Sequence, residues 1–194
     1  MHYDQELIFQ KLQTWEGYLQ KHALPTWEEL PTLELYMDQV ISLLSEYLMF
    51  LPKEDGADTI VTAAAINNYV RKKIMPPPVK KRYRRSHLAY LVIICSLKQC
   101  VGISYIQRML PPDLTEDEIR GIYDQFVARY RGTCLYFVRQ INAESESLWK
   151  SGNDAKTCSR DLVISAALLS GLTRMLAEQL LLQTTAASEA EENP

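Results

Sequence analysis

The sequence predicts an all-α fold that contains at most one short β-hairpin. Apolar residues recur at gaps of three and four along most of the chain, a spacing that places them on one face of a helix. Glycine is scarce, at 7 of 194 residues, whereas a β-rich chain needs glycine for its tight turns. The 47% hydrophobic content is that of an ordinary globular protein rather than a disordered one.

Three helices are expected in the first part of the chain. The first lies within residues 1–23 and ends at a turn bracketed by prolines. The second extends over about residues 33–50, where apolar residues keep helical spacing. The third begins after Thr62, a favourable N-cap residue, and ends at Arg71 or Lys72.

A basic turn separates the third helix from the fourth. The prolines Pro76–Pro78 exclude a helix, because each ring fixes φ and disfavours helix in the preceding residue. The run VKKRY that follows is expected to be a short strand or a wing-like loop. The fourth helix, about residues 86–101, is apolar nearly all round and should be buried. A short fifth helix, about residues 104–110, is expected to be capped by Ser104.

Two longer helices complete the predicted fold. The sixth opens with a capping box of Thr115 and Glu118, and continues to about Trp149 or breaks at Gly132. The last covers about residues 158–183 and carries two apolar stripes. A helix with two apolar stripes is expected to pack against more than one neighbour.

Charge is distributed unevenly along the chain. The net charge is −3, but the segment from Thr59 to Pro112 holds ten of the 21 Lys and Arg residues and none of the 24 Asp and Glu residues. A segment of +10 therefore lies within a body of −13. Such asymmetry is typical of chains that bind nucleic acid or another polyanion.

The polar face of the third helix and the basic run KKRYRR lie next to each other in the sequence, and both suit a duplex. Amide side chains read base edges in the major groove, and Lys and Arg neutralise phosphates without reading sequence. Asparagine also caps its own helix, so base contact by either asparagine remains one of two alternatives. Tyr69 and Tyr83 are expected mainly as core aromatics. The candidate DNA-binding residues are Thr62, Asn67, Asn68, Tyr69, Arg71, Lys72, Lys73, Lys80, Lys81, Arg82, Arg84 and Arg85.

Residues 62–110 resemble the winged helix-turn-helix of the mercury-resistance (MerR) regulator family. The resemblance rests on INNYVRKKIMPPP, then RY, then HLAYLVIICSLKQCVGISYIQRML. It implies a recognition helix, a short basic wing closed by Tyr83, and a following buried helix. The pattern departs from the family at Asn67, Asn68 and Lys73, where arginine, tyrosine and glycine are usual, and the wing is shorter.

A second resemblance covers more of the chain, roughly residues 24–130. The strings LPTWEELPTLELYMDQV and INNYVRKKIMPPPVKKRYRRSHLAYLVIICSLKQ are similar to the bacterial domain-of-unknown-function family 1836. This resemblance implies a bacterial cytoplasmic protein with the MerR-like fold and no established activity. A Ser-type helix cap is expected near Arg84, where this chain has arginine.

The two resemblances predict an all-α, MerR-like winged helix-turn-helix with a short wing, extended by N-terminal and C-terminal helices. By the family match, the helix after Thr115 pairs with its twofold mate in a homodimer, which suits two half-sites on double-stranded DNA. Folding of the same helices back onto the monomer is an equal alternative. The expected parts are an N-terminal helix (1–23), a DNA-binding domain (24–112), a C-terminal helical dimerisation or packing region (113–183) and a disordered acidic tail (184–194).

Other functions find little support in the sequence. There is no nucleophile–base signature, phosphate-cradling glycine loop or paired-carboxylate motif, so no enzyme and no cofactor are expected. The cysteines Cys95, Cys100, Cys134 and Cys158 form no CxxC pair, so no metal site is expected. No membrane span or effector-binding residue is recognised. The alternative function is a non-enzymatic adaptor module whose cationic face docks an acidic protein.

Overall fold

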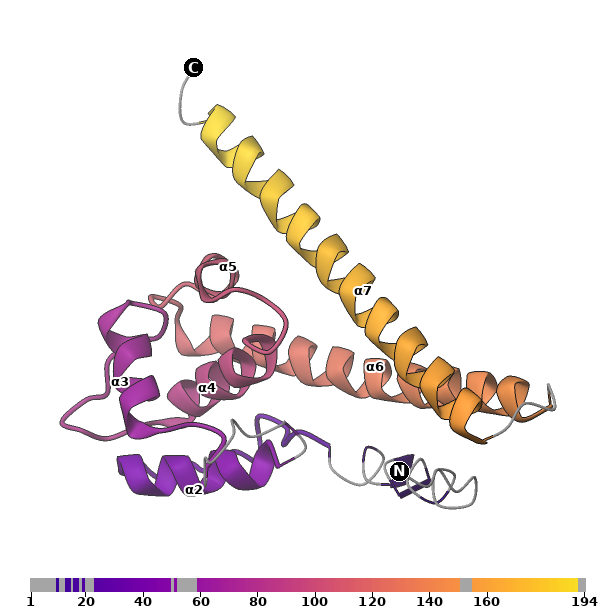
Figure 1. Ribbon diagram of the computed structural model, residues 1–194. Coiled ribbons are helices and arrows are strands. Elements are labelled where there is room, and N and C mark those ends of the chain that lie inside the picture. The colour runs from indigo at the N-terminus through magenta and orange to yellow at the C-terminus, as the bar shows by residue number, and fades with distance from the viewer. Residues whose placement is uncertain are drawn as a thin grey trace. The chain divides into compact units, whose positions relative to one another are not determined.

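The computed structural model describes residues 10, 13–14, 16–17, 19, 23–49, 51, 59–150 and 155–191. It divides into two compact units (Figure 1). The central unit is His22–Gly132, and the terminal unit joins Met1–Lys21 to Thr133–Pro194. The described residues form helices and two isolated β-bridges, which confirms the all-α prediction.

A buried helix organises the central unit. This helix, α4 (Arg85–Leu97), has nine consecutive buried residues from His87 to Cys95, as its all-round apolar sequence predicted. It packs against α2 (Met37–Tyr47) and α5 (Ile103–Met109), and α2 also packs against α3 (Ala63–Arg71). The elements on either side of the basic turn are therefore held by one core.

The first turns of α6 (Glu116–Lys150) complete that core. Ile119, Tyr123 and Val127 are buried, and the Tyr123 hydroxyl donates a hydrogen bond of 2.8 Å to the carbonyl oxygen of Pro25. The central unit thus continues past residue 112, where the sequence placed the end of the DNA-binding domain.

Local capping explains where several helices begin. The Thr62 hydroxyl accepts a 3.2 Å hydrogen bond from the Ala65 N–H, so Thr62 is the expected N-cap of α3. The Thr115 N–H donates to Glu118 Oε2 at 2.8 Å, and the Glu118 N–H donates to Thr115 Oγ1 at 3.4 Å, which confirms the capping box. The prediction for α5 was wrong, because its N-cap is Gly102 and Ser104 lies inside the helix.

The boundaries of two other helices differ from the sequence prediction. Residues 33–36 are not helical, because Leu35 pairs with Tyr83 in an antiparallel bridge, and α2 begins only at Met37. The α6 helix continues through Gly132 without a break. One glycine inside a helix costs only about 1 kcal/mol relative to alanine, which is too little to end a long helix.

The terminal unit contains the second part of α6 and α7 (Ala155–Glu191). The Asn142 side chain donates a 3.1 Å hydrogen bond to Glu16 Oε2 within this unit. Leu162 is buried, whereas most later Leu and Met residues of α7 are exposed. The α7 helix continues past Gln183 to Glu191, where the sequence predicted a disordered tail. The predicted N-terminal helix lies mainly outside the described residues.

Candidate nucleic-acid interface

The basic turn between α3 and α4 forms a two-residue β-hairpin. Val79 and Arg82 exchange backbone hydrogen bonds of 3.2 and 2.9 Å across the turn. The two central residues, Lys80 and Lys81, have φ values of 50° and 63°, and positive φ at both positions defines a type I′ turn. A second bridge joins Leu35 to Tyr83 through two backbone hydrogen bonds of 2.8 Å each. The hairpin is therefore anchored to the segment before α2.

The end of α3 also has an uncommon backbone conformation. Lys73 has a φ of 55°, its N–H donates to the Val70 carbonyl at 3.0 Å, and the Ile74 N–H donates to the Tyr69 carbonyl at 2.9 Å. These two bonds form a Schellman motif, whose left-handed position is usually glycine. The Gln107 side chain from α5 donates to the carbonyls of Lys72 (3.3 Å) and Lys73 (3.2 Å).

All three non-glycine residues with positive φ in the described part of the chain are therefore lysines of the basic segment. A left-handed conformation costs an ordinary residue about 1–2 kcal/mol, and asparagine or glycine would fill these positions with less strain. Strained positions of this kind cluster at functional sites, where the side chain matters more than local stability. Lysine thus occupies all three of these positions although its side chain offers no local conformational advantage there.

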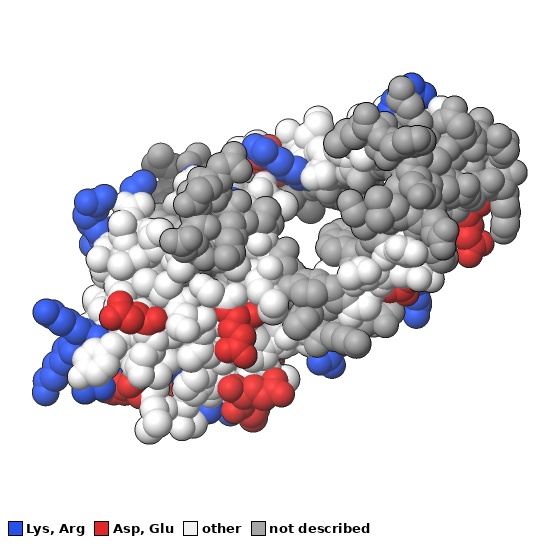
Figure 2. All heavy atoms as spheres, turned by 60° about the horizontal axis from the view of Figure 1, so that its bottom comes forward, with Lys and Arg blue, Asp and Glu red and all other residues white. Residues whose placement is uncertain are grey.

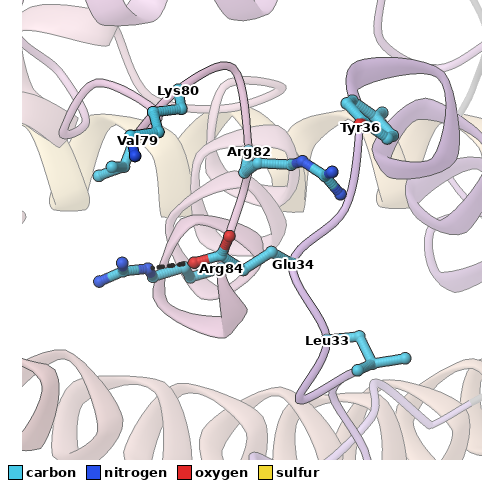
Figure 3. A pocket seen from close by; sticks show the side chains of 7 residues that line it. All are labelled: Leu33, Glu34, Tyr36, Val79, Lys80, Arg82 and Arg84. Atoms are coloured by element: carbon cyan, nitrogen blue, oxygen red, sulfur yellow. Dashed lines mark hydrogen bonds and ion pairs between the residues drawn. The ribbon is translucent and has the colours of Figure 1, made fainter.

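The arginines of the basic segment, by contrast, already have partners. Figure 3 shows Arg82 directed toward the ring of Tyr36, and the guanidinium carbon lies 3.8 Å from the ring centroid. Arg84 Nε pairs with Glu34 Oε1 at 2.9 Å. Arg85 Nε donates to the carbonyl oxygen of Leu30 at 3.1 Å.

The exposed face of α3 carries only part of the predicted recognition surface. Thr62, Asn67 and Arg71 are exposed, while Asn68 is half-buried and accepts a 2.8 Å hydrogen bond from Arg71 at its Oδ1. Tyr69 is 6% exposed, so its ring belongs to the core and is not open to a groove. Tyr83 is also buried, and both tyrosines are therefore core aromatics.

The lysines provide the open positive charge of this region. Lys72, Lys73, Lys80 and Lys81 are exposed, and none takes part in an ion pair found among the described residues. Figure 2 shows Lys and Arg spheres projecting on the side where Figure 1 draws α3. The basic segment thus combines exposed lysines outside these ion pairs with arginines that already contact another group.

One acidic residue lies among these cations. The sequence separates Glu34 from the acid-free segment, but the Leu35–Tyr83 bridge brings it against Arg84. The segment 59–112 is therefore free of acids in sequence but not in space, because Glu34 lies against Arg84. Glu34, Tyr36 and Leu33 line a hollow of about 840 Å³ together with Val79, Lys80, Arg82 and Arg84 (Figure 3).

A buried histidine fixes the start of α4. His87 is 4% exposed; its Nδ1 accepts a 3.0 Å hydrogen bond from the Arg84 N–H, and its Nε2 lies 3.2 Å from the Pro77 carbonyl oxygen. Burial lowers the pKa of His87 below its usual value of 6.5, partly offset by the hydrogen bond to Pro77. The neutral ring with its proton on Nε2 satisfies both contacts. The N-cap is Arg84 and not the expected Ser-type residue, and His87 supplies the N3 side chain that accepts from the N-cap N–H, a position where Glu or Gln is usual.

The family model described as a domain of unknown function (DUF1836) matches residues 25–126, which is more than half of the chain. The chain belongs to this family. The match confirms the second resemblance in the sequence and ends within the central unit that carries the hairpin and α3. Comparisons with curated proteins and with solved structures give no match.

Two kinds of site are not found among the described residues of this DUF1836 chain. Within them, no group of three or more His, Cys, Asp and Glu side chains is placed to hold a metal ion. No described helix is long and apolar enough to cross a membrane.

Proposed function

We propose that this DUF1836 chain binds double-stranded DNA as a MerR-like transcriptional regulator, with α3 as recognition helix and the 79–82 hairpin as a short wing. The observation that carries the proposal is the set of three left-handed lysines, Lys73, Lys80 and Lys81. Glycine or asparagine would fit these three positions with less strain. We infer that lysine is kept there because its positive charge contributes to binding. A nucleic-acid duplex is a polyanion with evenly spaced charges. A helix can enter its groove while a projecting hairpin contacts its phosphates.

In this proposal α3 contacts the bases and the hairpin contacts the phosphate backbone. Asn67 and Arg71 are exposed and lie one helical turn apart on α3, and amide and guanidinium groups both recognise base edges in the major groove. Asn68 Oδ1 is already occupied by Arg71, so Asn68 orients that arginine. Lys80 and Lys81 at the hairpin tip would neutralise phosphates and fix the register of α3 on the duplex.

We also propose that the chain acts as a homodimer. The observation in support is the exposed apolar face of α7, where Leu168, Leu172, Met175 and Leu176 are between 61% and 63% exposed. These residues lie at positions i, i+4, i+7 and i+8 and so share one helix face. An exposed apolar surface of this kind is typical of a protein interface. A twofold dimer would bind two half-sites on DNA.

The test is binding of the full chain to genomic duplex fragments, titrated with salt. We expect retention at low salt, loss of affinity as salt rises, and enrichment of a common site. Asn67→Ala should change the preference among sites, whereas Lys81→Ala should weaken binding to all sites alike. The control is Arg129→Gln with Arg131→Gln on α6, which removes exposed charge outside the basic segment. Absence of retention on any duplex, with capture of an acidic protein instead, would favour the adaptor function.

A further inference from the structure

The hollow beside the hairpin has the charges of an anion site. It is lined by three cations, Lys80, Arg82 and Arg84, and by one acid, Glu34. The cations come from the hairpin and the start of α4, while Glu34 comes from the extended segment before α2. Because the Leu35–Tyr83 bridge joins these two segments, the lining is fixed by backbone hydrogen bonds.

The side chain of Arg82 is held in one orientation at this hollow. Its guanidinium carbon lies 3.8 Å from the centroid of the Tyr36 ring, and this cation–π contact restricts the side chain while its N–H groups can still donate hydrogen bonds. A guanidinium held in this way loses less freedom when it binds phosphate through two parallel hydrogen bonds.

Arg84 already holds an anion, the carboxylate of Glu34. The pair is close at 2.9 Å, but both side chains are about half exposed, at 54% and 44%. Exposed ion pairs contribute little to stability, so an incoming anion can displace Glu34 from Arg84 at small cost. The Glu34 carboxylate therefore occupies the position at Arg84 that a competing anion would take.

We propose that this hollow is a phosphate-binding site in which Arg82, Arg84 and Lys80 hold the phosphate and Glu34 is the intramolecular competitor. The ligand chemistry is a phosphate oxyanion, either one phosphodiester of the DNA backbone or a free phosphate group. The first source rests on the proposed function, whereas the second does not. No covalent step is involved, and the Glu34 carboxylate swings into solvent when phosphate binds.

The experiment compares two variants with the same change of charge. Glu34→Gln removes the competitor, and Glu28→Gln is the matched control, because Glu28 forms an exposed ion pair with Arg120 of α6, outside the basic segment. Duplex DNA affinity is measured for both variants across a salt series. We expect the Glu34→Gln variant to bind duplex DNA about two- to fivefold more tightly than the Glu28→Gln variant. This factor corresponds to the free energy that an exposed ion pair typically contributes.

A second arm uses inorganic phosphate and needs no DNA. The Nε–Hε resonances of Arg82 and Arg84 are followed by NMR as phosphate is added, with chloride at the same ionic strength as control. Both resonances should move with phosphate, and at lower concentration in Glu34→Gln than in Glu28→Gln.

The two arms separate this inference from the proposed function. Movement of both arginine resonances without any duplex binding would support the phosphate site and count against DNA binding. Duplex binding with equal affinities for Glu34→Gln and Glu28→Gln, and with unmoved arginine resonances, would overturn the phosphate site alone.

Discussion

Replacing the two lysines at the hairpin tip with Asn-Gly should make the protein more stable and a weaker DNA binder. Lys80 and Lys81 occupy both left-handed positions of a type I′ turn, and Asn-Gly is the preferred pair for that turn. Each left-handed lysine costs about 1–2 kcal/mol, but asparagine keeps part of that strain and glycine adds up to about 1 kcal/mol of unfolded-chain entropy, so the free energy of unfolding should rise by about 1–2 kcal/mol in total. For a unit near 100 residues this corresponds to a rise of roughly 4–10 °C in Tm.

The same double variant removes two charges that we place on phosphates. Each phosphate contact contributes about 0.9 to the slope of log affinity against log salt, so the slope should become shallower by about 1.8. Between about 50 and 200 mM salt, the wild type should then lose about twelvefold more affinity than the variant. Most mutations that weaken binding by unfolding also lower Tm, so a rise in Tm with a shallower slope identifies a loss of contacts.

The assay is thermal unfolding by circular dichroism together with fluorescence anisotropy on one duplex over a salt series. Lys80→Arg with Lys81→Arg is the charge-preserving control and should keep both the slope and the strain. Arg129→Gln with Arg131→Gln removes two exposed charges elsewhere and should leave the slope near that of the wild type. An unchanged slope in the Asn-Gly variant would refute the phosphate contacts, and a lower Tm would refute the strain argument.

Three further predictions concern the fold and the assembly. Lys73→Gly should raise the free energy of unfolding by about 1 kcal/mol in urea denaturation, whereas Lys72→Gly, at a φ of −82°, should lower it. The stability should fall as pH drops below about 6.5, because burial lowers the pKa of His87 and the unfolded chain binds the proton first. Stability that rises on acidification from pH 7 to 5.5 would contradict the capping role of His87. Leu172→Asp should shift the chain from dimer to monomer in sedimentation equilibrium, whereas Ser170→Asp, off that apolar face, should not; a wild-type monomer would refute the dimer.

The features that the sequence predicted correctly depend on residues close together in the chain. Thr62 is recognised as a cap because its partner is three residues away, and the same holds for Thr115 and Glu118. The burial of α4 follows from an apolar run that leaves no polar face. Each of these patterns involves residues within one or two helical turns of each other. Together they predict the helices before and after the basic turn.

The missed features depend on long-range contacts or on backbone conformation. Glu34 and Arg84 are fifty residues apart, so only the Leu35–Tyr83 pairing brings acid and base together. Lysine has no preference for positive φ, and nothing in KK predicts a type I′ turn. The sequence therefore identified a basic segment but could not divide it into exposed lysines and partnered arginines.

The central claim is that the exposed lysines just after α3 and in the hairpin contact the phosphates of a duplex. Its most direct test is the affinity of the full chain for duplex DNA as a function of salt. If Lys72, Lys73, Lys80 and Lys81 each neutralise one phosphate, log affinity should fall against log salt with a slope of about −3.6. A slope near zero, or no binding to any duplex at low salt, would contradict the claim.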